Sequence, residues 1–202
     1  NAPDTGDTQI TDQMPRRSYP LGIMVNVEGR RFVDEGASFA EQTFVSTGQA
    51  VLRQKDGIAF QIFDSKSLPH LEGRYGGSNR IEANTTQEMA GKLGLDVKIF
   101  QETLESFNEQ AQDGDYTPRE LDARSTIDLD PPKSNWAIKL DVPPFVGFTV
   151  TGGITYTYGG LKIDTNSRVL RNDDQPIKGL FAAGEIVGGI FYHNSLRAAG
   201  LM

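Results

Sequence analysis

The sequence predicts an α+β fold, because amphipathic helical segments occur among short runs that have the composition of strands. The clearest helix spans residues 97–112, where apolar side chains recur at helical spacing. Strand-like runs cover residues 22–27, 58–63 and 145–151. The stretch 161–185 has the pattern of a β-hairpin followed by a short apolar strand. These observations together place helices in the middle of the chain and strands on both sides of them.

The helical segments carry start and stop signals. Asp96 precedes the longest helix as a candidate N-cap, and Gly94 separates that helix from a shorter amphipathic segment at residues 86–93. A further helix is expected over residues 38–54, although Gly48 weakens it. Apolar stripes of this kind usually face a core, so we expect these helices to serve as scaffold.

Proline and turn residues divide the rest of the chain. Residues 1–20 are polar and rich in proline, which predicts a linker or surface arm. The run 22–33 predicts a hairpin whose second strand is Arg31–Val33. Residues 113–133 are polar and contain three prolines, so we expect a long surface loop. Pro143 and Pro144 then break the chain, and we place a domain boundary there.

Composition excludes several classes of function. The 202 residues are 37% hydrophobic and 23% charged, as in an ordinary globular protein, and the net charge is −7. Nucleic acids and membrane surfaces select for basic patches, so neither partner is expected. No apolar run is long enough to span a bilayer and no signal peptide is visible, so we expect a cytoplasmic protein without direct membrane insertion. With no cysteine and two distant histidines, a metal site is not expected, and redox chemistry requires an organic cofactor.

The run Gly179–Glu185 is the most specific motif in the chain. It reads as a buried strand that ends in small residues, which let another group approach the backbone. The motif resembles the C-terminal flavin-contacting segment of the fumarate reductase/succinate dehydrogenase flavoprotein superfamily. This resemblance implies FAD as the cofactor and places Gly184 and Glu185 at its site, where Glu185 would bond a flavin-side hydroxyl. By the same resemblance, Asn194 and Leu201 belong to the cofactor site.

The dinucleotide fingerprint of that superfamily is absent. A strand, a G-x-G-x-x-G turn and a helix normally hold the pyrophosphate. None of the 22 glycines lies in such a context, and the pairs Gly159–Gly160 and Gly188–Gly189 do not fit it. We therefore interpret the chain as a piece of a larger flavoenzyme, cut near its middle. The opening Asn1–Ala2 would also suit a tag remnant.

Five further runs resemble the tricarballylate dehydrogenase branch of the superfamily. They are Arg16–Asn26, Phe32–Phe39, Pro132–Ala137, Thr151–Leu161 and Gly188–Asn194. The resemblance implies an FAD-dependent oxidation of tricarballylate to cis-aconitate, with hydride transfer to flavin N5. It also implies a membrane or soluble electron acceptor for the whole enzyme.

The same resemblance suggests how the chain is organised. After the arm at residues 1–20, residues 21–143 would form a substrate-capping domain. Residues 144–202 would form a β-rich C-terminal part of the FAD-binding domain.

The chain departs from plain fumarate reductases at three positions. The run Thr155–Gly160 lacks their histidine, and the run Asp34–Glu41 lacks their proton-donating arginine. Where they carry an Asn-Arg-Leu-Gly-Gly run, this chain has Asn194–Ala198, with its arginine displaced by two residues to Arg197. These departures disfavour a plain fumarate reductase or succinate dehydrogenase.

An enzyme of this kind must bind carboxylates and place an acid or base beside the reacting carbon. The candidate catalytic residues are Tyr158, His193 and Arg197, and the candidate substrate-binding residues are Thr155, Tyr156 and Arg197. His193 would contact substrate or flavin, or make a structural hydrogen bond. The two tyrosines either line the pocket or pack, and a lowered pKa would allow proton transfer. Arg197 is either a carboxylate ligand or a surface charge.

Other polar residues have simpler interpretations. His70 lies in a loop and is expected to be incidental. Arg16 and Arg17 could reach over the pocket mouth, but paired basic residues in a polar arm are more often solvated. Asp34 and Glu35 are expected to form a polar pair at a hairpin end.

Two other functions remain open. A related flavoprotein could reduce an enoate or oxidise a ketosteroid-like substrate, for which the tyrosine pair would be suited. Alternatively, the isolated chain could be a folded module without catalytic activity.

Overall fold

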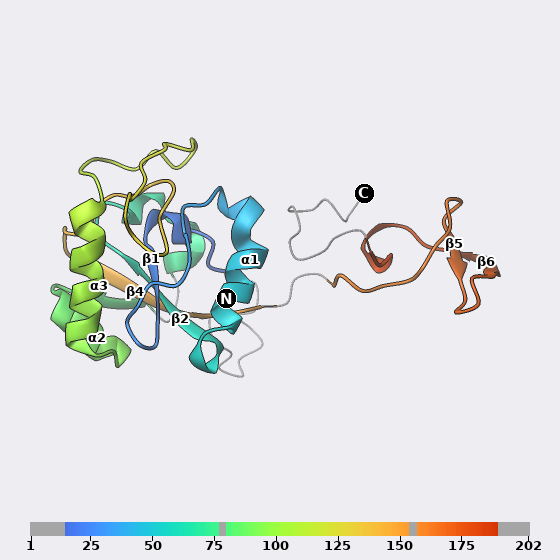
Figure 1. Cartoon of the computed structure of the whole chain (residues 1–202), viewed down its shortest axis with the longest axis horizontal. Helices are drawn as coiled ribbons and strands as arrows, with labels where there is room; N and C mark the ends of the chain where they lie inside the picture. The colour runs from blue at the N-terminus through green and yellow to red at the C-terminus, as the bar shows by residue number, and fades with distance from the viewer. Residues whose placement is uncertain (1–14, 77–79, 154–156, 190–202) are drawn as a thin grey trace. The chain divides into compact units, whose positions relative to one another are not determined.

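The computed structural model describes residues 15–76, 80–153 and 157–189, which fold into two compact units that divide after Gly153. The first unit is a mixed α and β structure, and the second is a small β structure (Figure 1). The α+β class predicted from the sequence is therefore confirmed. Among the described residues, no helix is both long and apolar enough to cross a membrane.

The first unit is built on a four-stranded antiparallel sheet with the order β1-β2-β4-β3. Its strands are β1 (Ile23–Asn26), β2 (Ile58–Phe63), β3 (Arg80–Ala83) and β4 (Phe145–Thr151). The expected strands at 22–27, 58–63 and 145–151 correspond closely to β1, β2 and β4. Because β4 lies between β2 and β3, the strand after the double proline belongs to this sheet. The compact unit thus extends ten residues beyond the domain boundary that we expected at 143/144.

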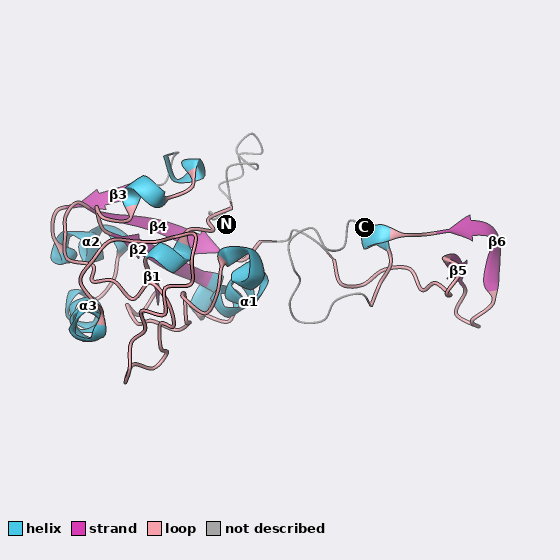
Figure 2. Cartoon of the chain, turned by 90° about the horizontal axis from the view of Figure 1, so that it is seen from above, coloured by secondary structure: helices cyan, strands magenta, loops and turns pink. Residues whose placement is uncertain are grey.

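Both faces of this sheet are covered, since successive side chains of a strand point to opposite faces. One face carries Ile23, Val25, Phe60 and Ile62, which pack with side chains of α2 (Thr86–Leu93) and α3 (Val97–Gln110). The other carries Met24, Ala59 and Val150, which pack with Val51 of α1 (Ala40–Leu52). Figure 2 shows α2 and α3 towards the left of this unit and α1 towards its right.

Local capping explains the agreement between predicted and observed helix ends. The Asp96 carboxylate accepts a hydrogen bond from the Ile99 amide at 3.0 Å, as expected for an N-cap. Thr85 caps α2 by accepting from the Glu88 amide at 3.1 Å. Gly94 ends α2 with φ of +69°, a conformation that favours glycine.

Three expected surface features are corrected by the structure. The described part of the expected arm is packed into the unit, since Arg16, Ser18 and Tyr19 are buried. The expected surface loop contributes buried side chains as well, among them Lys133. Of the second hairpin strand expected at 31–33, only Arg31 forms an isolated bridge, to Val25. The chain instead turns towards the segment around Pro131 and Pro132, whose carbonyls accept hydrogen bonds from the Arg31 guanidinium.

The second unit contains β5 (Arg168–Leu170) and β6 (Pro176–Phe181), which pair antiparallel. The first arm of the expected hairpin forms isolated bridges and no strand, through Leu161 and Ile163. We expected a buried strand at 179–185, but β6 ends at Phe181 and its side chains are largely exposed, with Phe181 63% accessible. Its apolar composition therefore has no matching cover among the described residues of this unit.

Candidate functional site

The second unit brings together two segments that the sequence analysis singled out. The amide of Leu161 donates to the Ile186 carbonyl at 2.8 Å, and the amide of Gly188 donates to the Leu161 carbonyl at 3.1 Å. Gly189 donates to the Tyr158 carbonyl at 3.3 Å. The run around Tyr158 therefore lies directly beside the run that contains Glu185, although the two are separated by more than twenty residues of sequence.

Glycine is required where these segments touch. A Cβ atom added to Gly160 would lie 2.3 Å from the Ile186 carbonyl oxygen and 2.6 Å from the Gly188 nitrogen. A Cβ atom on Gly188 would lie 2.6 Å from the Gly160 nitrogen. The glycine pairs that do not fit a dinucleotide fingerprint thus allow two backbones to approach each other closely.

Glu185 lies in a single helical turn, Gly184–Ile186, directly after the Ala182–Ala183 pair. Gly184 has φ of +75°, which favours glycine, and its carbonyl accepts from the Val187 amide at 3.0 Å. The Glu185 side chain is half-buried and forms no hydrogen bond or ion pair with the residues described. A carboxylate in this state is available to a donor from a bound molecule.

The hydroxyl of Tyr158 is buried and has no hydrogen-bond partner within the described ranges. Burial raises the pKa of Tyr158 above its ordinary value of 10.0. The lowered pKa that would favour proton transfer is therefore not observed, and at neutral pH this hydroxyl is a protonated donor. Unsatisfied buried hydroxyls are uncommon in folded proteins, so this group is well suited to bonding a ligand oxygen.

The remaining candidate residues lie outside the described residues. They are the substrate-binding candidates Thr155 and Tyr156, the catalytic candidates His193 and Arg197, and the cofactor candidates Asn194 and Leu201. Of the expected site, the structure brings together Tyr158, Gly184 and Glu185.

FAD fits the described part of this unit in two respects. Hydroxyl groups of the flavin side chain can donate hydrogen bonds to the Glu185 carboxylate, which has no partner among the residues described. Ring carbonyls of a flavin are acceptors, which suits the protonated and unpaired Tyr158 hydroxyl. No group of three or more potential metal ligands occurs among the residues described.

Sequence reasoning missed a buried polar network in the first unit. Glu35 is 0% exposed and accepts hydrogen bonds from the Arg31 guanidinium, at 2.6 Å from Nη2, and from the Met24 amide at 2.7 Å. Asp34 accepts from the Ser134 amide at 3.0 Å. The residues expected to form a polar pair at a hairpin end thus connect distant parts of the chain, because Asp34 and Ser134 are one hundred residues apart.

Lys133 completes this network. Its ammonium group donates to the carbonyls of Pro20 and Gly22 at 2.7 and 2.8 Å, and the residue is 1% exposed. Close packing accompanies these bonds, since a Cβ atom on Gly36 would lie 2.2 Å from the Asn135 carbonyl oxygen. The runs Phe32–Phe39 and Pro132–Ala137 therefore maintain the fold of the first unit. The sequence shows only a lysine between two prolines and Ser134-Asn135, and this context does not indicate burial.

Burial lowers the pKa of Lys133 from 10.5 to about 8. Because the unfolded chain binds this proton more tightly, the free energy of unfolding should rise as pH increases from about 8 towards 10.5. Below pH 8 the cost of burying the charged Lys133 ammonium should not change with pH. We expect the unfolding free energy of the wild type, minus that of Lys133→Met, to increase by roughly 2 kcal/mol between pH 8 and pH 10. Urea denaturation of both proteins measures this difference, and equal slopes with pH would contradict the expectation.

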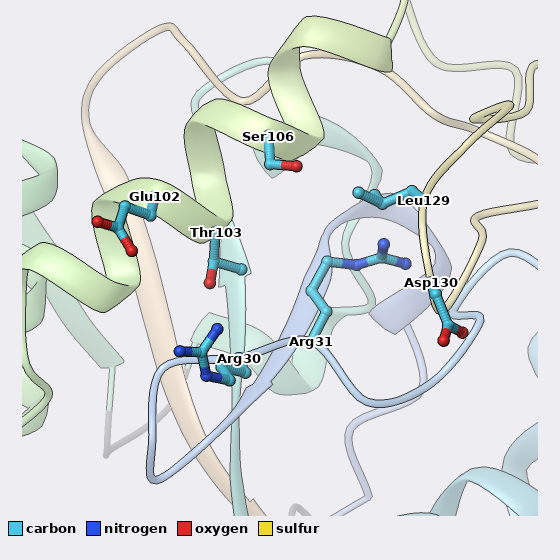
Figure 3. A pocket seen from close by; sticks show the side chains of 7 residues that line it. All are labelled: Arg30, Arg31, Glu102, Thr103, Ser106, Leu129 and Asp130. Carbon is cyan, nitrogen blue, oxygen red and sulfur yellow. The ribbon is translucent and has the colours of Figure 1, made fainter.

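A hollow lies on the first unit, between the turn after β1, helix α3 and the loop before Lys133 (Figure 3). Its volume is about 230 Å³, and its walls carry charges of both signs. The guanidinium of Arg31 is already engaged by Glu35, and Glu102 and Asp130 are acidic. This hollow does not have the electrostatic character of a polycarboxylate site. It is lined by Arg30, Arg31, Glu102, Thr103, Ser106, Leu129 and Asp130.

Comparison with known proteins agrees with the flavin-contacting motif. The chain matches the FAD binding domain family over residues 8–201. It is 31% identical to a urocanate reductase of Eggerthella lenta, over 89% of this chain and 28% of the relative. It is 30% identical to an NADH:fumarate oxidoreductase of Klebsiella pneumoniae, over 98% of this chain and 21% of the relative.

A solved structure supports the same assignment. The open conformation of a flavocytochrome c3 fumarate reductase matches with a TM-score of 0.63 at 25% identity, over 91% of this chain and 30% of that one. The chain therefore spans less than a third of the length of these relatives. It belongs to the FAD binding domain family.

Proposed function

We propose that this chain is part of an FAD-dependent oxidoreductase that dehydrogenates the carbon–carbon bond of a polycarboxylate, with tricarballylate oxidised to cis-aconitate. The observation that carries the flavin part is the pairing of the Tyr158 and Glu185 segments, each with a polar group that has no partner among the residues described. The polycarboxylate part is supported by the runs that resemble the tricarballylate branch. The relatives are named for fumarate and urocanate, both of which are unsaturated carboxylates.

In this proposal, FAD supplies the acceptor for the hydride that leaves one carbon of the bond. The neighbouring carbon loses a proton, for which His193 is the candidate acceptor because an ordinary histidine titrates near neutral pH. Arg197 would bind a carboxylate through its planar fork of donors. Tyr158, protonated and without a partner among described residues, would donate a hydrogen bond to substrate or flavin. A separate electron acceptor would then reoxidise the enzyme.

The substrate can be tested by anaerobic mixing of the full-length flavin-loaded protein with tricarballylate. We expect the yellow flavin absorbance to bleach and one cis-aconitate to form for each flavin reduced. Each oxidation removes one hydride and one proton from the substrate, and the flavin takes up the hydride. Succinate is the matched control, since it is a dicarboxylate with the same type of bond. Bleaching by a ketosteroid and not by tricarballylate would overturn the polycarboxylate assignment.

A second candidate, an enoate reductase, is favoured by the relatives named for fumarate and urocanate. Enoate reduction is the reverse of the dehydrogenation proposed above. Reoxidation of the reduced protein by cis-aconitate, fumarate or urocanate under anaerobic conditions separates the two. Rapid reoxidation by an enoate, together with no bleaching by tricarballylate, would identify a reductase.

A further inference from the structure

The hollow of Figure 3 has one wall that is held in place by buried contacts of the first unit. Arg31 lines the hollow, and its side chain is only 4% exposed. The Arg31 guanidinium is paired with Glu35 and lies over the ring of Phe107, with 5.4 Å between the guanidinium carbon and the ring centroid. Nη1 of Arg31 also donates to the Pro131 carbonyl at 2.8 Å. Arg31 is therefore a fixed and neutralised wall, and the charges that a ligand would meet come from other residues.

The turn after β1 presents Arg30 to the hollow. The side-chain oxygen of Asn26 accepts hydrogen bonds from the amides of Glu28 and Arg30 at 3.0 and 3.1 Å. A Cβ atom on Gly29 would lie 3.3 Å from the Phe100 nitrogen, so this turn packs closely against α3. The Arg30 side chain is exposed and forms no ion pair with the residues described. A guanidinium in this state can bind a carboxylate through two parallel hydrogen bonds.

Two carboxylates line the hollow on opposite sides of Arg31 (Figure 3). Glu102 projects from α3, and its carboxylate lies 3.8 Å from the exposed ammonium of Lys98. An exposed ion pair at such a distance contributes little, so Glu102 keeps most of its capacity to bind a cation. Asp130 comes from the facing loop, is exposed and forms no ion pair within the described ranges. Negative charge is therefore available on both sides of the hollow.

Uncharged groups complete the lining. The Thr103 hydroxyl donates to the Ile99 carbonyl at 2.9 Å, which leaves its lone pairs as acceptors. Leu129 is partly buried against the core and offers an apolar contact to methylene groups. The volume of about 230 Å³ is below the roughly 300–1,000 Å³ of pockets for drug-sized ligands, so the hollow suits a smaller molecule.

We propose that this hollow binds a free amino acid with a cationic side chain, such as arginine or lysine. Arg31 and Glu35 neutralise each other, and the remaining charges of the lining are one cation, Arg30, and two anions, Glu102 and Asp130. A basic amino acid has the complementary set, one carboxylate and two cationic groups joined by methylenes. The net charge of −7 also favours a ligand of net positive charge. This site lies entirely within the first unit and does not depend on the proposed flavin chemistry.

The test is titration calorimetry of the full-length protein with L-arginine and with agmatine, which is L-arginine without its carboxylate. We expect Arg30→Gln to weaken L-arginine binding by about fivefold and to leave agmatine binding unchanged, because only the carboxylate contacts Arg30. Asp130→Asn should weaken the binding of both ligands, because it removes a partner of a cationic group. Arg53→Gln is the matched control, since Arg53 is exposed, follows α1 and lies outside the hollow.

Three results would overturn the inference. The first is that the wild type binds neither L-arginine nor L-lysine. The second is an equal loss of L-arginine and agmatine binding in Arg30→Gln, since Arg30 would then not be the carboxylate ligand. The third is binding that Arg30→Gln and Asp130→Asn leave unchanged, which would place the ligand elsewhere. Both residues are exposed, so the variants should fold, and the fluorescence of the buried Trp136 checks this.

Discussion

Replacing Glu35 by alanine should destabilise the first unit by about 3–5 kcal/mol, because it leaves a buried charge without its partner. The side chains of Arg31 and Glu35 are 4% and 0% exposed, so water cannot replace the lost carboxylate. The Met24 amide in β1 would lose its acceptor at the same time. Trp136, the single tryptophan of the chain and buried in this unit, reports the transition by fluorescence during urea denaturation.

Two variants control this measurement. Glu35→Gln keeps an acceptor for the Met24 amide but removes the charge, so we expect a smaller loss of stability than in Glu35→Ala. Glu102→Ala removes an exposed carboxylate that lies 3.8 Å from Lys98, and its effect should be within about 0.5 kcal/mol. A Glu35→Ala protein as stable as Glu102→Ala would contradict the structural role given to this network.

Replacing Glu185 by alanine should weaken FAD binding by roughly 10- to 100-fold. A hydrogen bond to a charged group contributes about 1.5–3 kcal/mol, and every 1.4 kcal/mol is a factor of ten in affinity. Glu185 is half-buried and has no partner among described residues, so its loss should not disturb the fold of the second unit. Quenching of flavin fluorescence during titration of the full-length apoprotein measures the dissociation constant.

The control for this prediction lies in the same unit. Asp173 is an exposed carboxylate, 63% accessible, that pairs with Arg171 at the surface. Asp173→Ala should bind FAD as the wild type does. Equal FAD affinity in Glu185→Ala and Asp173→Ala would remove Glu185 from the cofactor site.

Local signals account for the parts of the fold that could be predicted. Helix α2 begins and ends where expected, because Thr85 caps its start and Gly94 ends it within a few residues of sequence. The strands β2 and β4 follow from β-rich composition at the predicted positions. Such features depend on neighbours along the chain, so a single sequence contains enough information to find them.

Non-local contacts account for most of the errors. Lys133 is buried because the carbonyls of Pro20 and Gly22, more than one hundred residues away, accept its hydrogen bonds. In the same way, the pairing of β4 with β2 and β3 places the strand after the double proline in the sheet of the first unit, while the functional division expected at 143/144 stays a prediction. Nothing in the residues next to these positions indicates such partners.

The candidate site was only partly predictable for the same reason. The motif around Glu185 was found through its resemblance to flavoproteins, whereas its contact with the Tyr158 segment depends on Gly160 and Gly188 meeting in space. The sequence also suggested that the Tyr158 pKa could be lowered, but burial of the hydroxyl acts in the opposite direction. Burial depends on the tertiary fold, which the local pattern of alternating threonine and tyrosine does not specify.

The measurement that tests the central claim most directly is the visible absorption spectrum of the purified full-length protein, recorded after incubation with FAD and desalting. If the segments around Tyr158 and Glu185 form part of a flavin site, a flavin band should remain with the wild-type protein and be reduced in Glu185→Ala. A folded wild-type protein that is colourless after desalting would contradict the assignment of these residues to a flavin site.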